Sequence, residues 1–347
     1  MKKRHVNIPI FIPHLGCPNQ CVFCNQRIIS GVEDFEAESV VKIIEDSLST
    51  VKSTDDVEIA FFGGSFTGIE RSLMCNLLKI AYSYIERGLV SSIRCSTRPD
   101  YIDEEILAIL KKYGVKTIEL GLQSFDSEVL LKTKRGHTAE DEIRACKMIV
   151  DNGFDLVGQM MIGLPGSTLD SELKTAKFIV DSGAVGARIY PTVVFTQTEL
   201  CQMALLGVYE PLTLDDAIIR SERVLRVFLD AGVDVIRIGL CASENLTSSS
   251  TCYAGPNHPS LGELVENELY YNLIKERIED IATDSFSGKV VVLVSRGALS
   301  KAIGQRKRNK FRLVNELNLI SLSFSESDEL NGYDILIRQE ERTDKCT

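Results

Sequence analysis

No stretch of the 347-residue sequence approaches 18 uninterrupted apolar residues, so a membrane-spanning helix is not expected. The sequence also has no low-complexity tract, and it has no internal repeat beyond the alternation of strands and helices described below. Its hydrophobic content of 44% is enough to bury a sizeable core. We therefore expect a globular chain that does not bind membranes.

We do not expect a secretory signal either. The N-terminus begins basic and then turns apolar, but Pro9, Pro13 and His14 interrupt the apolar stretch, and no small-residue cleavage site follows. We interpret this stretch as a first strand. Ten cysteines without a signal are expected to be mostly small buried side chains in a reducing compartment, which predicts a cytoplasmic protein. The net charge of -10 repels phosphate backbones, so RNA binding would need a local basic patch.

Short β-branched runs alternate with longer segments of helical periodicity, at about 30 residues per unit. This pattern predicts an α/β protein, a partial or open barrel of about six parallel strand–helix units over residues 1–245, followed by a small α+β extension or cap over residues 246–347. In the extension we expect a helix at 263–281, a strand at 289–295, a basic helix at 298–311 and a weak strand pair. The expected strands of the first part are 6–12, 57–62, 90–96, 115–121, 155–162, 185–190 and 233–239, and its helices lie near 36–50, 70–87, 103–113, 139–152, 168–182 and 213–231.

Three cysteines have a spacing that plain packing does not explain. Cys17, Cys21 and Cys24 form C-x3-C-x2-C in the loop after the first expected strand. Thiolates are the preferred ligands of iron–sulfur clusters, and three of them would leave one iron of a [4Fe–4S] cluster open. A structural zinc site would need a fourth ligand, for which His14 is the nearest candidate. The iron–sulfur interpretation is favoured, with zinc and simple packing as the alternatives.

The motif and its surroundings resemble the radical S-adenosylmethionine (SAM) superfamily over roughly residues 6–245. Within it the chain looks most like the radical-SAM core of the Elp3 family, the catalytic subunit of Elongator, without the acetyltransferase domain. It is more distantly similar to the oxygen-independent coproporphyrinogen oxidases. The stretches that carry the resemblance are GCPNQCVFCNQ (16–26), FFGGSFTG (61–68), STRPDYID (96–103), ELGLQS (119–124), KRGHT (134–138), QMMIGLPG (159–166) and RIYPT (188–192).

The resemblance implies roles for residues at the ends of successive strands. It places the methionyl ammonium of SAM against Gly63, Gly64 and Ser65, although a Gly-Gly pair is also an ordinary strand exit. It places adenine beside Phe23 and beside the backbone from Ile162 to Leu164. The aromatic ring of Phe23 could equally face the core.

The remaining implied contacts are polar. Ser96 stands where relatives often carry a ribose-binding Glu, and a serine there has shorter reach. Gln123 and Arg135 match polar SAM contacts, Arg135 as a partner of the methionyl carboxylate or else as a solvated surface arginine. Gln159 is Asp in some relatives, which favours the Elp3-like branch. Tyr190 is the candidate catalytic side chain facing the substrate, or a packed aromatic.

These observations predict a radical SAM enzyme that uses a [4Fe–4S] cluster to cleave SAM to a 5'-deoxyadenosyl radical, acting on an RNA base or a small metabolite. The alternatives are a coproporphyrinogen-oxidase-like enzyme acting on a porphyrin and a non-catalytic cluster-bearing protein. A reducing partner such as flavodoxin or ferredoxin is implied. Arg306, Lys307 and Arg308 lie in a basic run that predicts either a solvated helix face or an RNA patch, without a complete GxxG loop of the KH type.

Overall fold

The computed structural model describes residues 4–17, 21–30, 35–52, 55–240, 251–282 and 288–339. Within these ranges no helix has the length and apolar character that crossing a membrane requires. The chain divides into two compact units, one of residues 1–217 with 223–259 and one of residues 218–222 with 260–347. The boundary expected at residue 245 lies outside the described residues.

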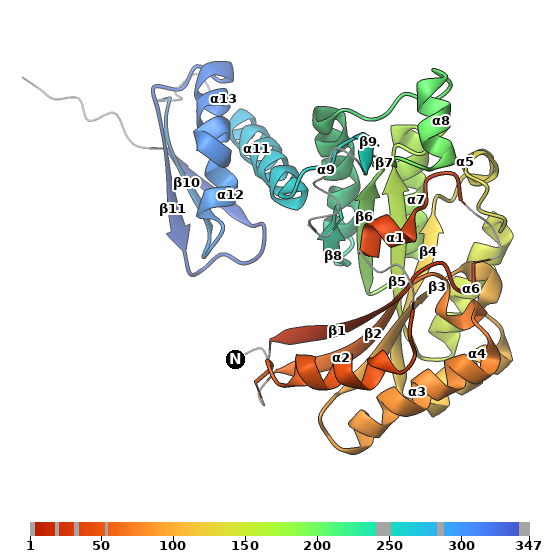
Figure 1. Ribbon diagram of the computed structural model, residues 1–347. Coiled ribbons are helices and arrows are strands. Elements are labelled where there is room, and N and C mark those ends of the chain that lie inside the picture. The colour runs from red at the N-terminus through yellow and green to blue at the C-terminus, as the bar shows by residue number, and fades with distance from the viewer. Residues whose placement is uncertain are drawn as a thin grey trace, which may run out of the picture. The chain divides into compact units, whose positions relative to one another are not determined.

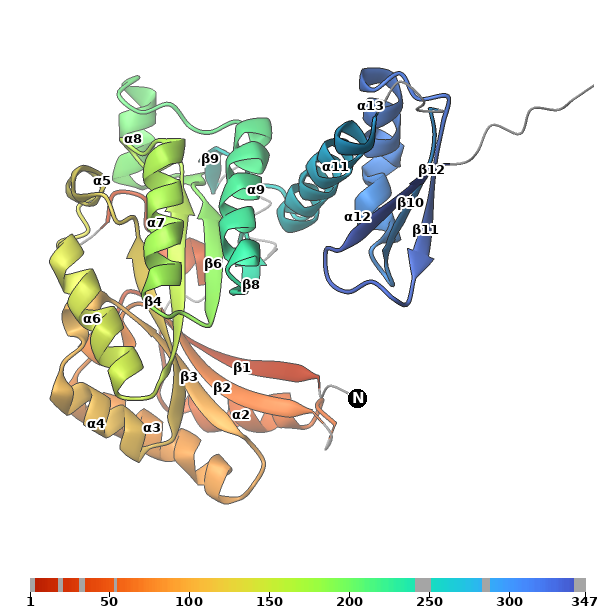
Figure 2. The same ribbon diagram turned by 180° about the vertical axis from the view of Figure 1, so that it is seen from behind.

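The first unit contains a seven-stranded sheet in which every neighbouring pair is parallel and the strands follow chain order. The sheet curls into an open half-barrel, and the long helices that connect its strands lie on the outer side (Figures 1 and 2). This confirms the predicted fold class. The strands are β1 (His5–Ile12), β2 (Asp56–Gly63), β3 (Ser92–Thr97), β4 (Val115–Gln123), β5 (Asp155–Ile162), β6 (Gly186–Pro191) and β8 (Asp234–Ile238).

Each expected helix of this unit is present within a few residues of its predicted bounds. The helices are α2 (Ser39–Leu48), α3 (Arg71–Glu86), α4 (Glu104–Lys112), α6 (Ala139–Asp151), α7 (Leu169–Asp181) and α9 (Leu214–Asp230). Their starts are set by local chemistry, as at Thr138, where a capping box with Asp141 begins α6. Short elements add to the predicted pattern: α1 (Gln26–Ser30), α5 (Ser127–Lys132), α8 (Glu199–Leu205) and the pair β7 (Val194–Phe195) with β9 (Cys252–Ala254).

Side chains alternate between the two faces of each strand, and this alternation separates the core from the site. In β4, Ile118, Leu120 and Leu122 are fully buried on one face, whereas Glu119, which is also buried, and Gln123 belong to the opposite face. Parallel strands bring their carboxyl ends to one edge of the sheet, so the residues that end β2, β3 and β4 become neighbours.

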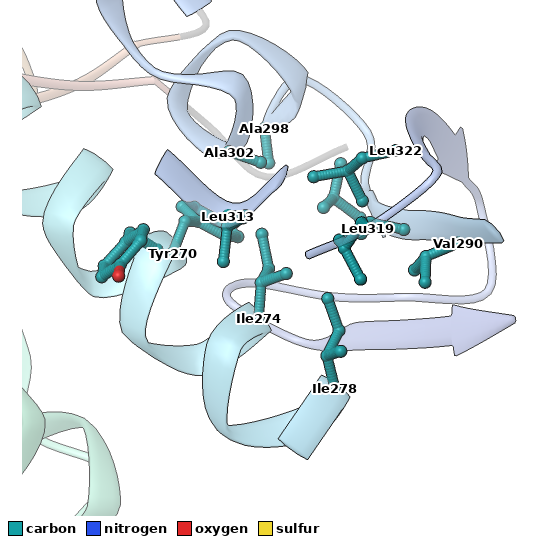
Figure 3. Close-up of a cluster of buried hydrophobic side chains, with 12 residues drawn as sticks. Tyr270, Ile274, Ile278, Val290, Ala298, Ala302, Leu313, Leu319 and Leu322 are labelled. Carbon is teal, nitrogen blue, oxygen red and sulfur yellow. The ribbon is translucent and has the colours of Figure 1, made fainter. Parts of the chain in front are cut away.

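The described residues of the second unit after Ser260 contain a three-stranded sheet and three α-helices. Its elements are α11 (Leu261–Ile281), β10 (Lys289–Ser295), α12 (Leu299–Ile303), α13 (Arg308–Glu316), β11 (Ser321–Ser327) and β12 (Ile335–Gln339). Tyr270, Ile274 and Ile278 of α11 pack with Leu313 of α13 and Val290 of β10 in one apolar core (Figure 3).

Two expectations for this unit are wrong. The weak strands do not pair with each other, because β10 lies between them, parallel to β11 and antiparallel to β12. The basic helix expected over residues 298–311 is two helices, because Gly304 ends α12 at a φ of 78° and α13 begins only at Arg308.

Candidate functional site

A cavity of about 790 Å³ opens at the carboxyl ends of the central strands of the first unit. Its lining comes from the cysteine loop, from the ends of β2, β3 and β4, and from β5. The sequence-predicted residues among its lining are Cys17, Cys21, Cys24, Gly63, Gly64, Ser65, Ser96, Gln123 and Arg135, joined by His14, Asn25, Gln26, Arg27, Ile28, Thr97, Arg98, Gly121, Gln159, Gln197 and Thr251.

Backbone hydrogen bonds hold the cysteine loop at the rim of this cavity. The amide of Val22 donates to the carbonyl of Thr133 at 3.2 Å, and its own carbonyl accepts from Leu200 at 2.8 Å. The amide of Cys24 donates to the carbonyl of Cys21 at 3.0 Å, which closes a tight turn between the two cysteines. The loop thus presents three thiols to one cavity while α5 and α8 fix its backbone.

The turn after β2 packs directly against the loop after β1. The amide of Gly64 donates to the carbonyl of Ile12 at 2.8 Å, and that of Ser65 donates to the carbonyl of Leu15 at 3.0 Å. A Cβ atom on Gly64 would collide with the carbonyl of Leu15, so glycine is required there for contact between two backbone segments. The Ser65 hydroxyl then lies 3.5 Å from the sulfur of Cys17.

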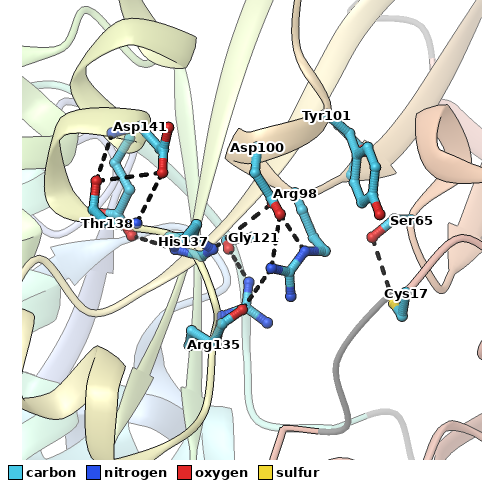
Figure 4. Close-up of polar contacts among 12 residues, drawn as sticks. Cys17, Ser65, Arg98, Asp100, Tyr101, Gly121, Arg135, His137, Thr138 and Asp141 are labelled. Atoms are coloured by element: carbon cyan, nitrogen blue, oxygen red, sulfur yellow. Dashed lines mark hydrogen bonds and ion pairs between the residues drawn. The ribbon is translucent and has the colours of Figure 1, made fainter.

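Arg135 is buried, with only 6% of its surface exposed, so its interpretation as a solvated surface arginine is wrong. Its Nη1 donates to the sulfur of Cys21 at 3.2 Å, and its Nη2 donates to the carbonyl of Gly121 at 2.5 Å. Figure 4 shows the guanidinium of Arg98 beside it, donating through Nη2 to the carbonyl of Arg135. Arg98 is in turn fixed by a bidentate pair with Asp100, at 2.9 and 3.0 Å.

This arginine pair places positive charge on one side of the cysteines, and two of its N–H groups have no partner in the described part of the chain. Nη1 of Arg98 and Nε of Arg135 are buried and have no hydrogen-bond partner among the described residues. Burial raises the pKa of Cys24 to about 12, the neighbouring Cys21 and Cys17 add to the increase, and Arg135 opposes it. A buried thiol of this kind becomes a thiolate only when a bound cation compensates its charge.

A network of buried ion pairs joins side chains of β3, β4 and β6. Glu119 is fully buried and accepts from Nη1 of Arg94 at 2.8 Å and from Nε and Nη2 of Arg188 at 2.8 and 2.9 Å. Its fourth bond comes from the amide of Gln159 at 2.7 Å, and that amide also donates to Ser96 at 3.2 Å. Glu119 therefore orients two side chains of the cavity lining.

Gln123 has an unusual backbone at the end of β4. Its φ is 72°, and the register with β5 shifts between Gly121 and Gln123. A bulge of this kind redirects a side chain at a strand end, and a left-handed non-glycine residue is a strained feature that clusters at functional sites. The strand thus turns Gln123 into the cavity lining.

Four sequence-predicted residues are not part of that lining. Phe23 packs with the apolar cluster of Val22 and Leu200. Ile162 and Leu164 are buried at and just beyond the end of β5. Tyr190 lies in β6, where burial raises its pKa. Their assigned roles stay predictions.

The structure also bears on the zinc alternative and on the remaining cysteines. The Nε2 atom of His14 accepts a hydrogen bond from the amide of Gln26 at 3.0 Å, which occupies the lone pair that a zinc ion would need there. No group of three or more His, Cys, Asp or Glu side chains has the spacing of a metal-ion site in the part of the chain that the structure describes. Of three further cysteines near strand ends, Cys95 is fully buried and Cys252 is half-buried, whereas Cys241 lies outside the described residues.

Sequence reasoning missed Arg98 as a site residue, and it missed the network around Glu119. A signal for both was available. Arg98 follows directly on the Ser96–Thr97 strand end, and Glu58, Arg94, Glu119 and Arg188 are charged residues in the middle of predicted strands, where a charge needs a buried partner.

Comparisons with known proteins agree with this geometry. The Radical SAM superfamily matches residues 11–179, and the Radical_SAM C-terminal domain matches residues 184–271. A tRNA uridine(34) acetyltransferase of Methanocaldococcus infernus is 32% identical over 185 residues, covering 48% of this chain and 35% of that protein. The chain thus spans about a third of the length of this curated relative.

Two further comparisons cover more of the chain. An uncharacterized protein of Methanocaldococcus jannaschii is 31% identical over 230 residues, covering 62% of this chain and 69% of that protein. The solved structure of the Methanocaldococcus infernus Elp3 with an N-terminal deletion has a TM-score of 0.61 at 22% identity, covering 80% of this chain and 64% of that one. The structural likeness shows a shared fold.

Proposed function

Because this chain belongs to the radical SAM superfamily and is an enzyme of Elp3-like type, we propose that Cys17, Cys21 and Cys24 hold a [4Fe–4S] cluster with which it cleaves SAM reductively. The observation that carries the proposal is the position of the three cysteines on one cavity with Ser65 and Arg135. A bound cluster supplies an electron to the sulfonium of SAM, which yields methionine and a 5'-deoxyadenosyl radical.

The residues of the cavity suit this assignment chemically. Three thiolates, with no fourth protein ligand found among the described residues, match a cluster with one open iron. The bond between His14 and Gln26 weighs against zinc. The hydrogen bond from Arg135 to Cys21 would offset thiolate charge, as donors near cluster sulfurs do.

The chain's own residues would bind and orient SAM. We assign the carbonyls of Gly63 and Gly64 with Ser65 to the methionyl ammonium, and Arg135, whose Nε lacks a partner among the described residues, to the carboxylate. Ser96 would contact the ribose, and Gln123 would make a further polar contact to SAM. Adenine would lie against Phe23 and the backbone of Ile162 and Leu164, and Tyr190 would face the substrate.

For the substrate we propose an RNA base or a small metabolite. The support for RNA is the similarity to a tRNA uridine(34) acetyltransferase and to Elp3, of which the chain matches only a part. The electron would come from a reducing partner such as flavodoxin or ferredoxin.

The test of the radical step is the formation of 5'-deoxyadenosine. Anaerobically reconstituted protein with dithionite and SAM should form it, and Cys21→Ala should not. Cys75→Ala is the matched control, because Cys75 lies on α3 away from the cavity lining and should leave the product unchanged. Equal product from wild type and Cys21→Ala would refute the assignment. Comparing nucleoside masses in total tRNA with and without the gene tests the RNA form of the substrate.

A further inference from the structure

The second unit has a helix–loop–helix segment between two parallel strands. Strand β10 leads into α12, the residues Gly304–Lys307 connect α12 to α13, and α13 leads into β11. β10 and β11 pair in parallel, with Val290 opposite Leu322. Figure 3 shows that α12 and α13 are anchored to this sheet through Ala302, Leu313 and Leu322. The connecting loop is therefore carried by a packed scaffold.

The loop itself has a defined backbone. Gly304 has a φ of 78°, and a Cβ atom there would press on Asn309 at 2.9 Å. Arg306 and Lys307 follow with φ of 51° and 64°, a left-handed conformation that is unfavourable for non-glycine residues. Asn309 is 2% exposed, and its Nδ2 donates to the carbonyls of Asn267 at 2.6 Å and Ala302 at 3.2 Å. These hydrogen bonds attach the C-terminal end of the loop to α11 and α12.

The side chains of the loop are exposed and cationic. Gln305, Arg306, Lys307 and Arg308 are all exposed, between the buried Gly304 and Asn309. No described residue forms an ion pair or side-chain hydrogen bond with the three cations. The segment 301–312 contains six basic residues and no acidic one, in a chain whose net charge is -10.

Basic side chains near the loop, in contrast, form ion pairs. Lys301 pairs with Glu266 at 2.8 Å, Arg312 with Glu268 at 2.6 Å, and Lys275 with Glu316 at 3.0 Å. The unit therefore neutralises cations beside the loop and leaves those of the loop unpaired. This contrast is not expected of a merely solvated helix face.

Helix α13 adds to the attraction for anions. Its nine residues begin directly at the loop, with no side-chain cap at Lys307 and no acidic residue in the first turn. The free amide groups and the dipole at such a helix start favour a phosphate. Free backbone N–H groups and three basic side chains thus occur close together in this short segment.

We propose that the loop Gly304–Arg308 binds the sugar–phosphate backbone of single-stranded RNA. Several adjacent cations without a buried pocket suit successive phosphates of a strand rather than one small anion. The segment Gly-Gln-Arg-Lys between two short helices corresponds to the GxxG loop with which KH modules clamp the backbone of about four nucleotides, with lysine at the last position. This inference rests on the RNA form of the proposed function and names where the RNA is held.

The test uses the full-length, anaerobically reconstituted protein without SAM or reductant. A fluorescein-labelled, mixed-sequence single-stranded RNA of about 12 nucleotides is titrated by anisotropy at several salt concentrations. The double variant Arg306→Glu, Lys307→Glu should weaken binding by about tenfold or more at low salt. It should also reduce the slope of log affinity against log salt by about 1.4, since each single-strand phosphate contact contributes about 0.7.

The matched control is Arg277→Glu, Arg296→Glu, which changes the net charge equally at two exposed positions of the same unit. It should retain most of the affinity. Absence of RNA binding by wild type, equal losses in both double variants, or equal competition by duplex DNA would each overturn the proposal. Formation of 5'-deoxyadenosine is measured separately on the same preparations. Loss of RNA binding by the loop and loss of the radical step are therefore distinguished.

Discussion

Removing the charge of Glu119 should destabilise the first unit strongly. This carboxylate is fully buried and accepts from Arg94, Arg188 and Gln159 at 2.7–2.9 Å. In Glu119→Gln, Arg188 loses its carboxylate partner, whereas Arg94 keeps Glu58 at 2.7 Å. Removing one partner of a buried ion pair costs about 3–5 kcal/mol. We expect a loss of that size in the free energy of unfolding, measured by urea titration.

The control is Asp151→Asn, which breaks the exposed pair with Lys147, whose side chain is 72% exposed. That change should cost less than about 1 kcal/mol, because exposed ion pairs contribute little. If Glu119→Gln lowers the free energy of unfolding no more than Asp151→Asn does, the buried network does not hold the half-barrel together. Its role in orienting Gln159 and Ser96 would then also be refuted.

Further predictions concern protonation and cofactor binding. Burial pushes the pKa of Glu119 up, but the charges and hydrogen bonds of Arg188 and Arg94 outweigh it and hold the pKa below the usual 4.5. Its contribution is therefore complete above pH 4.5 and is lost as pH falls through the folded-state pKa, so the stability difference between wild type and Glu119→Gln should shrink in acid urea titrations. Burial, aided by Arg135 and Arg98, lowers the pKa of His137 to about 3. Stability should consequently fall as pH drops from 6.5 toward 3, and a flatter thermal-melting profile is expected for His137→Phe, with an unchanged profile counting against the buried neutral imidazole. Arg135→Ala should weaken SAM binding in anaerobic equilibrium dialysis while the cluster absorbance remains, and unchanged affinity would remove Arg135 from the SAM site.

Most of the first unit was predictable because its strands and helices alternate regularly. Short, largely apolar runs such as 155–162 have the length of strands, and strand ends define where a site must lie. The short elements α5 and α8 were missed because six or seven residues give too little periodicity. In the second unit, β11 and β12 each pair with β10 and not with each other, an arrangement that local sequence does not encode.

The basic segment shows why tertiary contacts decide some local structure. Its composition favours one helix. In the structure, however, Gly304 lies against Asn309, whose side chain is hydrogen-bonded to the carbonyl of Asn267, and Arg306 and Lys307 have left-handed backbone angles. In the site, motif residues such as Cys17 and Ser65 were predictable from their strand ends. The partnership of Arg135 with Cys21 joins positions 114 residues apart, and it required the fold.

The most direct test of the central claim is metal and sulfide analysis of anaerobically purified protein, combined with electron paramagnetic resonance after reduction. Three cysteines on one cavity predict iron and sulfide in equal amounts, a reduced-cluster signal that SAM perturbs through the open iron, and loss of both in Cys21→Ala. Stoichiometric zinc without sulfide, or a cluster signal that SAM leaves unchanged, would contradict the account.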